Sequence, residues 1–513
     1  MKTRRILAVI LAAIMIFSLA GVCMAEQSEG DVKYREEITI GYDIAIVSLN
    51  RFNPGMDGTS YQRSYLLLWD RLTDSTAEGE VIPMLATEWS TEDYKTWNFK
   101  LRDDVYFTNG EQLTADDVVY TFEKATEAIG TSTYDNMGRN FESAEIISDF
   151  ELNITLQNVD VDFAYCLSLP TTGIINRKAC EEDFETGVSV GSGPWILDNI
   201  VSGDSATFVR NENYWGEVPV TKKLVCKYIA EEAARLMMLE NDEVQVALGC
   251  NFQSDYPYIE QNPDKFEVFD CITGDPAYVA FNMNDPITGD LNFRKAVASV
   301  IDRETYVAVS RNGYGIPCTT GAFWGYEAEY WNDEIPVLPL DYDAAKEYLA
   351  ASSYNGEEVT ITCALPNCIS DAQMLQEALK SIGVNAVLNQ TDTAGMNSTA
   401  TYSNNTAQII VYLYSWPGRA SSARSVLYPE AATNRASYNN PEVAELLDQA
   451  GATLDEAERE AIYKQVQEIV AEDLPYVCTY YNRTIIGARK GVGGLEMRTN
   501  QHHRLANIYM IEE

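Results

Sequence analysis

The stretch LATEWSTEDYKTWNFKLRDDVYFTNGEQLTADDVVYTF, residues 85–122, decides the fold. In its first half, Trp97, Phe99 and Leu101 alternate with polar residues. This period of two residues is typical of a strand that buries one face and exposes the other. The first half therefore predicts a half-buried strand.

The second half of the stretch predicts a tight turn followed by a helix. Asn109-Gly110 supplies the positive φ angles that a tight turn needs. Thr114 is placed to cap a helix whose first turn carries Asp116 and Asp117, where negative charge is favourable at the positive end of the dipole. The apolar stripe of this helix consists of Val118, Val119 and Phe122.

This stretch resembles the signature region of the family 5 extracellular solute-binding proteins, the oligopeptide-, dipeptide- and nickel-binding receptors of ABC importers. Further segments resemble the same family, in the same order along the chain. They are GSGPW (191–195) with RNENYWG (210–216), VAFNMNDP (279–286) with FRKAVASVID (293–302), and LDYDAAKEYLA (340–350). The resemblance thus extends over nearly the whole chain.

The resemblance implies an α/β protein with a two-lobed periplasmic-binding-protein-like fold of the class II, cluster C type, with an extra inserted α+β domain. It assigns residues 36–70, 187–275 and 488–513 to lobe I, residues 71–186 to the inserted domain, and residues 276–487 to lobe II. Hinge-bending closure around a ligand would then be the mechanism.

The residues near position 360 independently predict an α/β unit. Residues 359–363 and 384–388 both alternate as strands. Between them, Ser370 with Gln373 forms a capping box, and Gly383 is placed to end the helix. A strand-helix-strand run of this kind predicts a parallel strand pair with a right-handed crossover.

The N-terminus has the layout of a secretory signal over residues 1–25. Three basic residues precede an apolar run at 6–19, and small residues follow. Cleavage after Ala25 and lipid anchoring through Cys23 both stay open. We expect an exported protein in the periplasm or at the extracytoplasmic face of the membrane.

The chain is strongly acidic, with 37 Lys and Arg against 77 Asp and Glu and a net charge of −40. This charge argues against nucleic acid or an anionic membrane surface as a partner. It fits a solvated acidic surface that keeps an exported protein soluble.

Cysteine and histidine usage does not predict a metal site or a cofactor. The chain has 10 cysteines including Cys23, and export permits disulfides, although their pairing cannot be read from the sequence. The spacing of Cys363 and Cys368 lacks the second pair of a zinc site. His502 and His503 are adjacent, so on a strand they would point to opposite faces, which favours a structural role.

One motif favours a function of another class. Residues 187–191, GVSVG, satisfy the G-x-S-x-G pattern of a hydrolase nucleophile elbow centred on Ser189. Such an elbow opens directly into a helix, whereas Ser192-Gly193-Pro194 is turn chemistry. A secreted serine hydrolase is therefore the alternative, and we expect a protein that is not an enzyme.

The candidate ligand residues follow from the resemblance. Peptide-binding members read close to Trp-x-x-Asp after one strand, and that Asp holds the peptide ammonium group, whereas this chain has Trp416-Pro417-Gly418-Arg419. Arg pairs with carboxylate or phosphate, so Arg419 predicts a neutral or anionic ligand group, and Arg424 could add to the same patch. In the alternative interpretations, Trp416 lies in the core and Arg419 on the surface.

Two asparagines complete the predicted site. Asn50 belongs to the loop 48–54, which resembles a family loop that lines the cleft. Asn282 lies near the expected lobe crossing and could orient a ligand backbone or be structural.

The sequence as a whole predicts the substrate-binding component of an ABC importer. A peptide or peptide-like ligand is the family default, and an oligosaccharide or an anionic metabolite is the alternative. The expected partners are permease subunits with their ATPases, since the chain has no P-loop of its own. We expect a monomer, and a sensory receptor shares every one of these sequence features.

Overall fold

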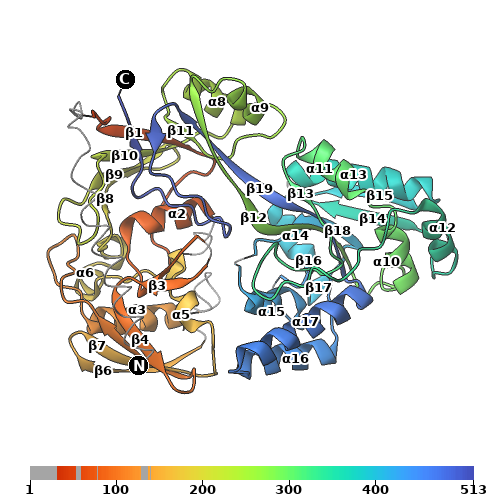
Figure 1. Ribbon diagram of the computed structural model, residues 1–513, viewed down its shortest axis with the longest axis horizontal. Helices are drawn as coiled ribbons and strands as arrows, with labels where there is room; N and C mark the ends of the chain where they lie inside the picture. Colours follow the sequence, from red (N-terminus) through yellow and green to blue (C-terminus); the bar gives the residue numbers. More distant parts are fainter. Residues whose placement is uncertain are drawn as a thin grey trace, which may run out of the picture.

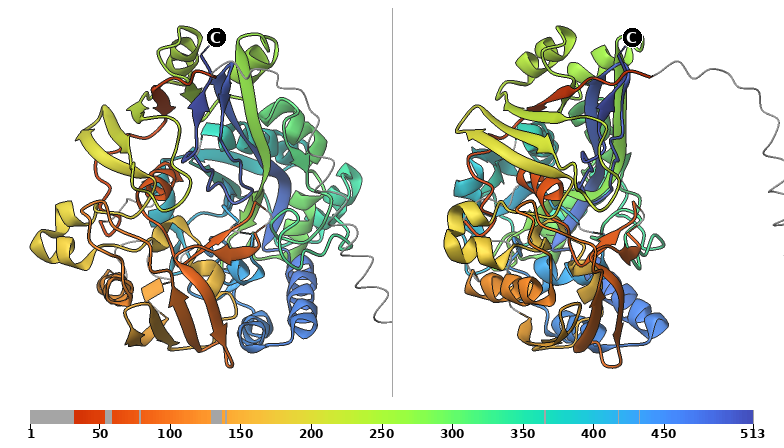
Figure 2. Two further views of the ribbon diagram at one scale, coloured as in Figure 1. Left: turned by 60° about the vertical axis from the view of Figure 1, so that its left-hand side comes forward. Right: turned by 90° about the vertical axis from the view of Figure 1, so that its left-hand side faces the viewer.

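The computed structural model describes residues 32–53, 59–77, 79–128, 137–138, 140–364, 366–416, 418–431 and 433–512. Two lobes lie side by side and are joined by two long strands, β12 (Phe266–Phe281) and β19 (Tyr476–Arg489) (Figure 1). These strands pair antiparallel and stay side by side in every view (Figure 2). Their register is irregular between Ile272 and Pro276, in the middle of the connection.

One 11-stranded sheet runs through both lobes. We call the half on the left of Figure 1 lobe I and the half on the right lobe II. The strand order is β15 (Asn385–Gln390), β14 (Glu358–Cys363), β18 (Ile409–Leu413), β12, β19, β11 (Val246–Ala247), β1 (Glu37–Tyr42), β10 (Lys223–Tyr228), β9 (Ser205–Arg210) and β8 (Trp195–Val201), with β13 (Ile316–Pro317) also paired to β19.

The decisive stretch forms the predicted strand, turn and helix, although of Asn109 and Gly110 only Gly110 has a positive φ. Residues 96–101 form β5 (Thr96–Leu101), and α3 spans Ala115–Glu127. Gly110 has φ +86°, and the Asp117 carboxylate accepts a hydrogen bond from Thr114 N at 3.0 Å. The apolar side chains that the alternation predicted to be buried are at most 6% exposed.

β5 belongs to a four-stranded sheet at the lower end of lobe I in Figure 1. Its order is β4 (Ala86–Thr91), β5, β7 (Glu151–Leu156) and β6 (Phe141–Ser148). One apolar cluster, including Trp69, Trp97 and Trp195, continues from lobe I into this sheet. The sheet lies within the predicted inserted domain, whose exact boundaries stay a prediction.

The predicted α/β unit of lobe II is present, with one correction. β14 and β15 are parallel, in register from Glu358 opposite Asn385. The helix between them, α13 (Pro366–Ser381), begins before Ser370, so the predicted capping box is wrong. Ser370 lies inside the helix, where its hydroxyl is 3.0 Å from that of Ser310.

The remaining elements cover the sheets or connect them. Those of lobe I and the attached sheet are α2 (Thr59–Leu68), β2 (Thr73–Ser75), β3 (Val81–Pro83), α5 (Phe163–Cys166), η1 (Pro170–Thr172), α6 (Arg177–Glu182), α7 (Phe184–Gly187), α8 (Glu232–Glu240), α9 (Asp255–Glu260), β20 (Val492–Gly493) and β21 (Tyr509–Met510). Those of lobe II are α10 (Leu291–Ala298), α11 (Arg303–Ser310), α12 (Tyr342–Ala350), α14 (Thr393–Thr399), β16 (Ala400–Thr401), β17 (Asn404–Asn405), η2 (Ala420–Ser422), α15 (Ala423–Leu427), α16 (Pro441–Ala452) and α17 (Glu456–Asp473). Within the described residues, none of these helices combines the length and apolar character needed to span a membrane.

Candidate functional site

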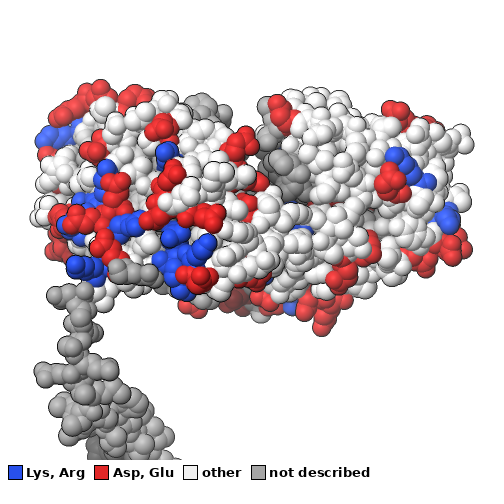
Figure 3. All heavy atoms as spheres, turned by 90° about the horizontal axis from the view of Figure 1, so that it is seen from above, with Lys and Arg blue, Asp and Glu red and all other residues white. Residues whose placement is uncertain are grey.

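The space-filling view shows a notch between the two lobes (Figure 3). Segments of both lobes approach each other around the middle of β12. Asp275 of β12 is 2% exposed, and its carboxylate accepts a hydrogen bond from Trp416 N at 2.8 Å. The same carboxylate accepts one from the Gln501 side chain. The Asp275 carboxylate therefore holds three chain segments together. We call Asp275, Trp416, Gln501 and their contacts the interlobe junction.

Electrostatics at the interlobe junction are dominated by burial. Desolvation raises the pKa of Asp275 to about 6, and its hydrogen bonds to Thr273, Trp416 and Gln501 limit the rise. The neighbouring Gly274 N donates to Thr499 O at 3.2 Å, which adds a second link between β12 and the C-terminal segment.

Trp416 lies in the core of lobe II rather than on an open wall. Its side chain is 1% exposed and packs against Trp324, with ring centroids 4.9 Å apart. A Cβ added to Gly325 would stand 2.5 Å from the indole, so a glycine is needed for this close approach. The indole N–H is buried without a hydrogen-bond partner among the described residues. A direct contact between Trp416 and ligand stays a prediction, and its burial agrees with the core alternative.

Arg419 crosses from lobe II to the opposite side of the junction. Its guanidinium forms an ion pair with Glu329 at 3.2 Å and donates to Gly79 O at 3.1 Å. The same group stands over the Tyr165 ring, 4.3 Å from the centroid. Arg419 is thus neither a free surface residue nor an unpaired cation.

Glu329 holds both the side chain and the backbone of this segment. One carboxylate oxygen accepts from Arg419, and the other accepts from Ala420 N at 3.1 Å. Burial raises the pKa of Glu329 and the charge of Asp162 adds to the rise, whereas Arg419 opposes it. The Arg419–Glu329 pair presents a fixed dipole with no net charge when both groups are ionised.

Asn50 is buried in a loop of lobe I, where structural contacts occupy its side chain. Its amide donates to Glu185 at 3.0 Å and accepts from Phe52 N at 3.1 Å. These bonds fix the loop. A ligand contact for Asn50 stays a prediction.

Asn282 and Arg424 lie in lobe II with local partners of their own. The Asn282 amide donates to Asn405 O and accepts from Asn284 N, each at 3.0 Å. Arg424 pairs with Asp448 at 2.6 Å, and its side chain is 47% exposed. Neither residue shares a described contact with Arg419, so their joint patch with Arg419 stays a prediction.

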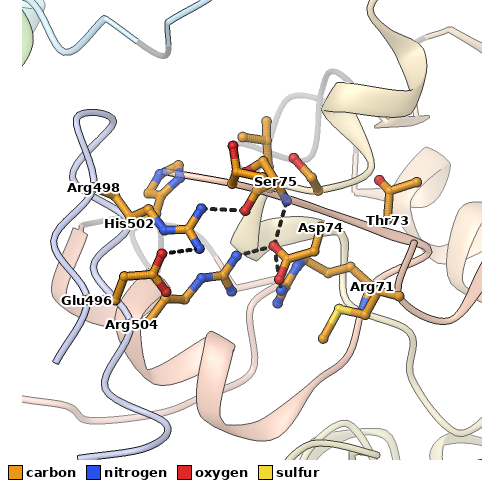
Figure 4. A network of polar contacts seen from close by, with 12 residues as sticks. Arg71, Thr73, Asp74, Ser75, Glu496, Arg498, His502 and Arg504 are labelled. Carbon is orange, nitrogen blue, oxygen red and sulfur yellow. Dashed lines mark hydrogen bonds and ion pairs between the residues drawn. The ribbon is translucent and has the colours of Figure 1, made fainter. Parts of the chain in front are cut away.

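His502 lies beside a network of polar contacts (Figure 4), and His503 contacts Arg498, which belongs to that network. His503 accepts from Arg498 N at 3.0 Å, and burial lowers its pKa to about 2. Burial, together with the surrounding arginine charges, also lowers the pKa of His502 to about 3. Both therefore stay neutral at neutral pH, which agrees with a structural role.

The same network fastens the C-terminal loop, residues 496–504, to β2. Arg504 and Arg71 both pair with Asp74, and Arg498 donates to Ser75 O (Figure 4). This anchoring positions the loop that carries Gln501 to the junction.

Ser189 lies in a turn and not in a strand-to-helix elbow. Its hydroxyl donates to Thr186 O at 2.7 Å, and the chain continues through a turn into β8 rather than into a helix. A Cβ at Gly191 would stand 1.8 Å from Leu68 O, so this motif is a close backbone crossing over the end of α2. The motif is thus a packing feature.

Four junction residues were missed by sequence reasoning: Tyr165, Asp275, Glu329 and Gln501. Each acts through partners far away in the chain; Glu329, for example, is 90 residues from Arg419. Among the described residues, no group of three or more His, Cys, Asp or Glu side chains is arranged to hold a metal ion.

Comparisons with known proteins agree with this architecture. A family model described as bacterial extracellular solute-binding proteins, family 5 Middle, matches residues 80–438. The nickel-binding periplasmic protein of Escherichia coli (strain K12) is 23% identical over 502 residues, covering 90% of this chain and 92% of that protein. The probable D,D-dipeptide-binding periplasmic protein DdpA of the same strain is 26% identical over 462 residues, 85% of each chain.

A solved structure shares the whole fold. The ABC transporter substrate-binding protein CtaP from Listeria monocytogenes superposes with a TM-score of 0.82 at 22% identity, covering 94% of this chain and 100% of that one. This likeness confirms the predicted two-lobed periplasmic-binding-protein-like fold.

Proposed function

Because the chain belongs to the bacterial extracellular solute-binding proteins of family 5, it is a solute-binding receptor, and we propose that it captures a small peptide or peptide-like solute between its lobes. The loaded receptor would deliver this solute to ABC permease subunits. The relative named as a probable D,D-dipeptide-binding periplasmic protein, at 26% identity, supports the ligand class. The protein is exported. For its N-terminus we propose either cleavage after Ala25 or lipid anchoring through Cys23.

The Arg419–Glu329 pair is the observation that carries the proposal about the ligand end. The resemblance described above implies that family members which hold a peptide ammonium group have an acid at the position of Arg419. Here Glu329 already compensates the arginine at 3.2 Å, so the pair has no net charge to offer an ammonium group. We infer that the ligand presents a neutral, hydrogen-bonding group to this pair, with an anionic group as the alternative.

Closure is proposed to bend β12 and β19 where their register is irregular, between Ile272 and Pro276. Arg419 already reaches Gly79 and Tyr165 across the junction. Closure would bring Arg419, Gly79 and Tyr165 into contact with the ligand.

Equilibrium dialysis against two peptide pools tests the ligand assignment. One pool contains two- to five-residue peptides with free amino ends, and the other contains the same peptides N-acetylated. We expect the ligand-free protein to retain N-acetylated peptides as well as free ones, within roughly threefold in affinity. Arg419→Asp should then weaken retention of acetylated peptides, whereas the control Arg177→Met, at an exposed arginine outside the predicted site, should not.

Two results would contradict this assignment. Retention of free peptides more than roughly tenfold better than acetylated ones would mean that an ammonium site exists. If the folded protein retains neither pool, an oligosaccharide or an anionic metabolite would be favoured as the ligand.

The hydrolase alternative is tested separately. It requires turnover of ester substrates that the Ser189→Ala substitution abolishes.

A further inference from the structure

Two cysteines from distant parts of lobe II lie side by side. β13 pairs antiparallel with β19, with Pro317 opposite Tyr480, and Cys318 N continues the ladder by donating to Thr479 O at 3.1 Å. Cys318 and Cys478 are 2% and 4% exposed and form one buried apolar cluster with Tyr481. The fold therefore brings together two cysteines that are far apart in the sequence.

The two thiols face each other and differ in acidity. Cys318 Sγ donates to Thr320 O at 3.2 Å and lies 3.6 Å from the Tyr481 hydroxyl, and each thiol is close enough to influence the pKa of the other. Burial alone would raise the pKa of Cys318, but the bonds from Cys478 and Tyr481 and the charge of Arg303 lower it to about 7. Burial instead raises the pKa of Cys478.

The other described cysteines differ from Cys318 in this respect. Burial raises the pKa of Cys180, Cys226 and Cys250 to about 12 each. A thiol with a high pKa is a poor nucleophile at neutral pH, because the thiolate is the attacking species. In the folded cluster, Cys318 is thus the described thiol whose thiolate form is most favoured.

We propose that Cys318 and Cys478 are joined by a disulfide bond in the exported protein. Cys478 lies on β19 and Cys318 directly follows the strand β13 that pairs with it, the two are buried together, and the chain is expected to fold outside the reducing cytoplasm. Their burial means that the bond forms during folding, before the cluster closes.

The oxidant is a protein disulfide of the thiol–disulfide oxidoreductase class. The Cys318 thiolate attacks one sulfur of that disulfide, which forms a mixed disulfide and releases one oxidant thiol. The Cys478 thiolate then attacks the Cys318 sulfur and releases the second oxidant thiol. The two electrons and the two cysteine protons end on the reduced oxidant.

The bond would fix the lobe II end of the hinge. β19 carries Cys478 near its start and then crosses to lobe I, so the cross-link ties the crossing strand to the segment that follows α11. It would close a loop of roughly 160 residues, a length for which the entropic effect on the unfolded chain is large. Bending would be confined to the part of β19 beyond the cross-link.

Thiol counting on the secreted wild-type protein tests the proposal. The mature protein is denatured with excess N-ethylmaleimide, with or without prior reduction, and weighed intact. Nine cysteines are present outside the N-terminal segment. We expect seven labels without reduction and nine after it, and a protease fragment linking Cys318 to Cys478. Nine labels without reduction, or a bridge between other cysteines, would overturn the proposal.

Serine variants sharpen the assignment. Cys318→Ser and Cys478→Ser should each give eight labels with or without reduction, because the remaining partner is left free. The control Cys226→Ser should keep the bridge and give six labels that rise to eight on reduction. Dithiothreitol should lower the unfolding midpoint of wild type and leave that of the double variant unchanged; equal shifts in both would contradict a stabilising bridge. If a variant does not fold, the wild-type count still decides.

Discussion

The ion pair between Arg419 and Glu329 should contribute measurably to stability. Its side chains are 23% and 20% exposed, and the charged atoms are 3.2 Å apart. Exposed pairs contribute about 0–1 kcal/mol, whereas breaking a fully buried pair costs about 3–5 kcal/mol. For this intermediate burial we expect a coupling free energy of about 1–2 kcal/mol.

A double-mutant cycle measures this coupling. Arg419→Met keeps the length of the stem and removes the charge, and Glu329→Gln keeps the shape and the bond to the backbone. Urea unfolding of the ligand-free wild type, the two single variants and the double variant isolates the pair from its surroundings. The matched control is Arg424 with Asp448, whose side chains are 47% and 54% exposed.

The control pair should couple by no more than about 0.5 kcal/mol, and added salt should screen it more completely than the Arg419 pair. A coupling for Arg419 and Glu329 no larger than that of the control would refute the reasoning. In that event the segment would be held by backbone contacts alone.

Two further predictions concern the junction and its support. Burial raises the pKa of Asp275 to about 6, so its stabilising contribution is present below the unfolded value of about 3.9 and is lost as pH rises through 6. The difference in unfolding free energy between wild type and Asp275→Asn should therefore fall by about 2 kcal/mol from pH 4 to pH 7 in urea titrations, and a constant difference would disprove the shift. Gly325→Ala should cost about 1–3 kcal/mol and alter tryptophan fluorescence, because its Cβ would stand 2.5 Å from the Trp416 indole. Gly451→Ala in α16 meets open space and should stabilise by about 0.5–1 kcal/mol; equal effects of the two substitutions would contradict the packing account.

Local elements were predictable because their causes are local. The alternation around Phe99 and the turn at Gly110 are contained within a few residues, and both appear as predicted. Ser370 shows the limit of this approach. The capping pattern is real in the sequence, but the helix begins earlier and Ser370 instead meets Ser310, which is 60 residues away.

The interlobe junction could not be predicted from the sequence, because its contacts join residues that are far apart along the chain. Arg419 was identified by position, yet its partners Glu329 and Gly79 are 90 and 340 residues away. The burial of Trp416 likewise depends on the absent side chain of Gly325. Charge compensation and close packing are set by chain crossings, which composition and periodicity do not encode.

The most direct test of peptide capture is thermal unfolding of the refolded, ligand-free mature protein with and without a pool of two- to five-residue peptides. A ligand present at roughly 100 times its dissociation constant stabilises the folded state by about 2.7 kcal/mol. We expect a clear rise in the unfolding midpoint that grows with peptide concentration. An unchanged midpoint for a fully folded protein across the whole pool would contradict the account.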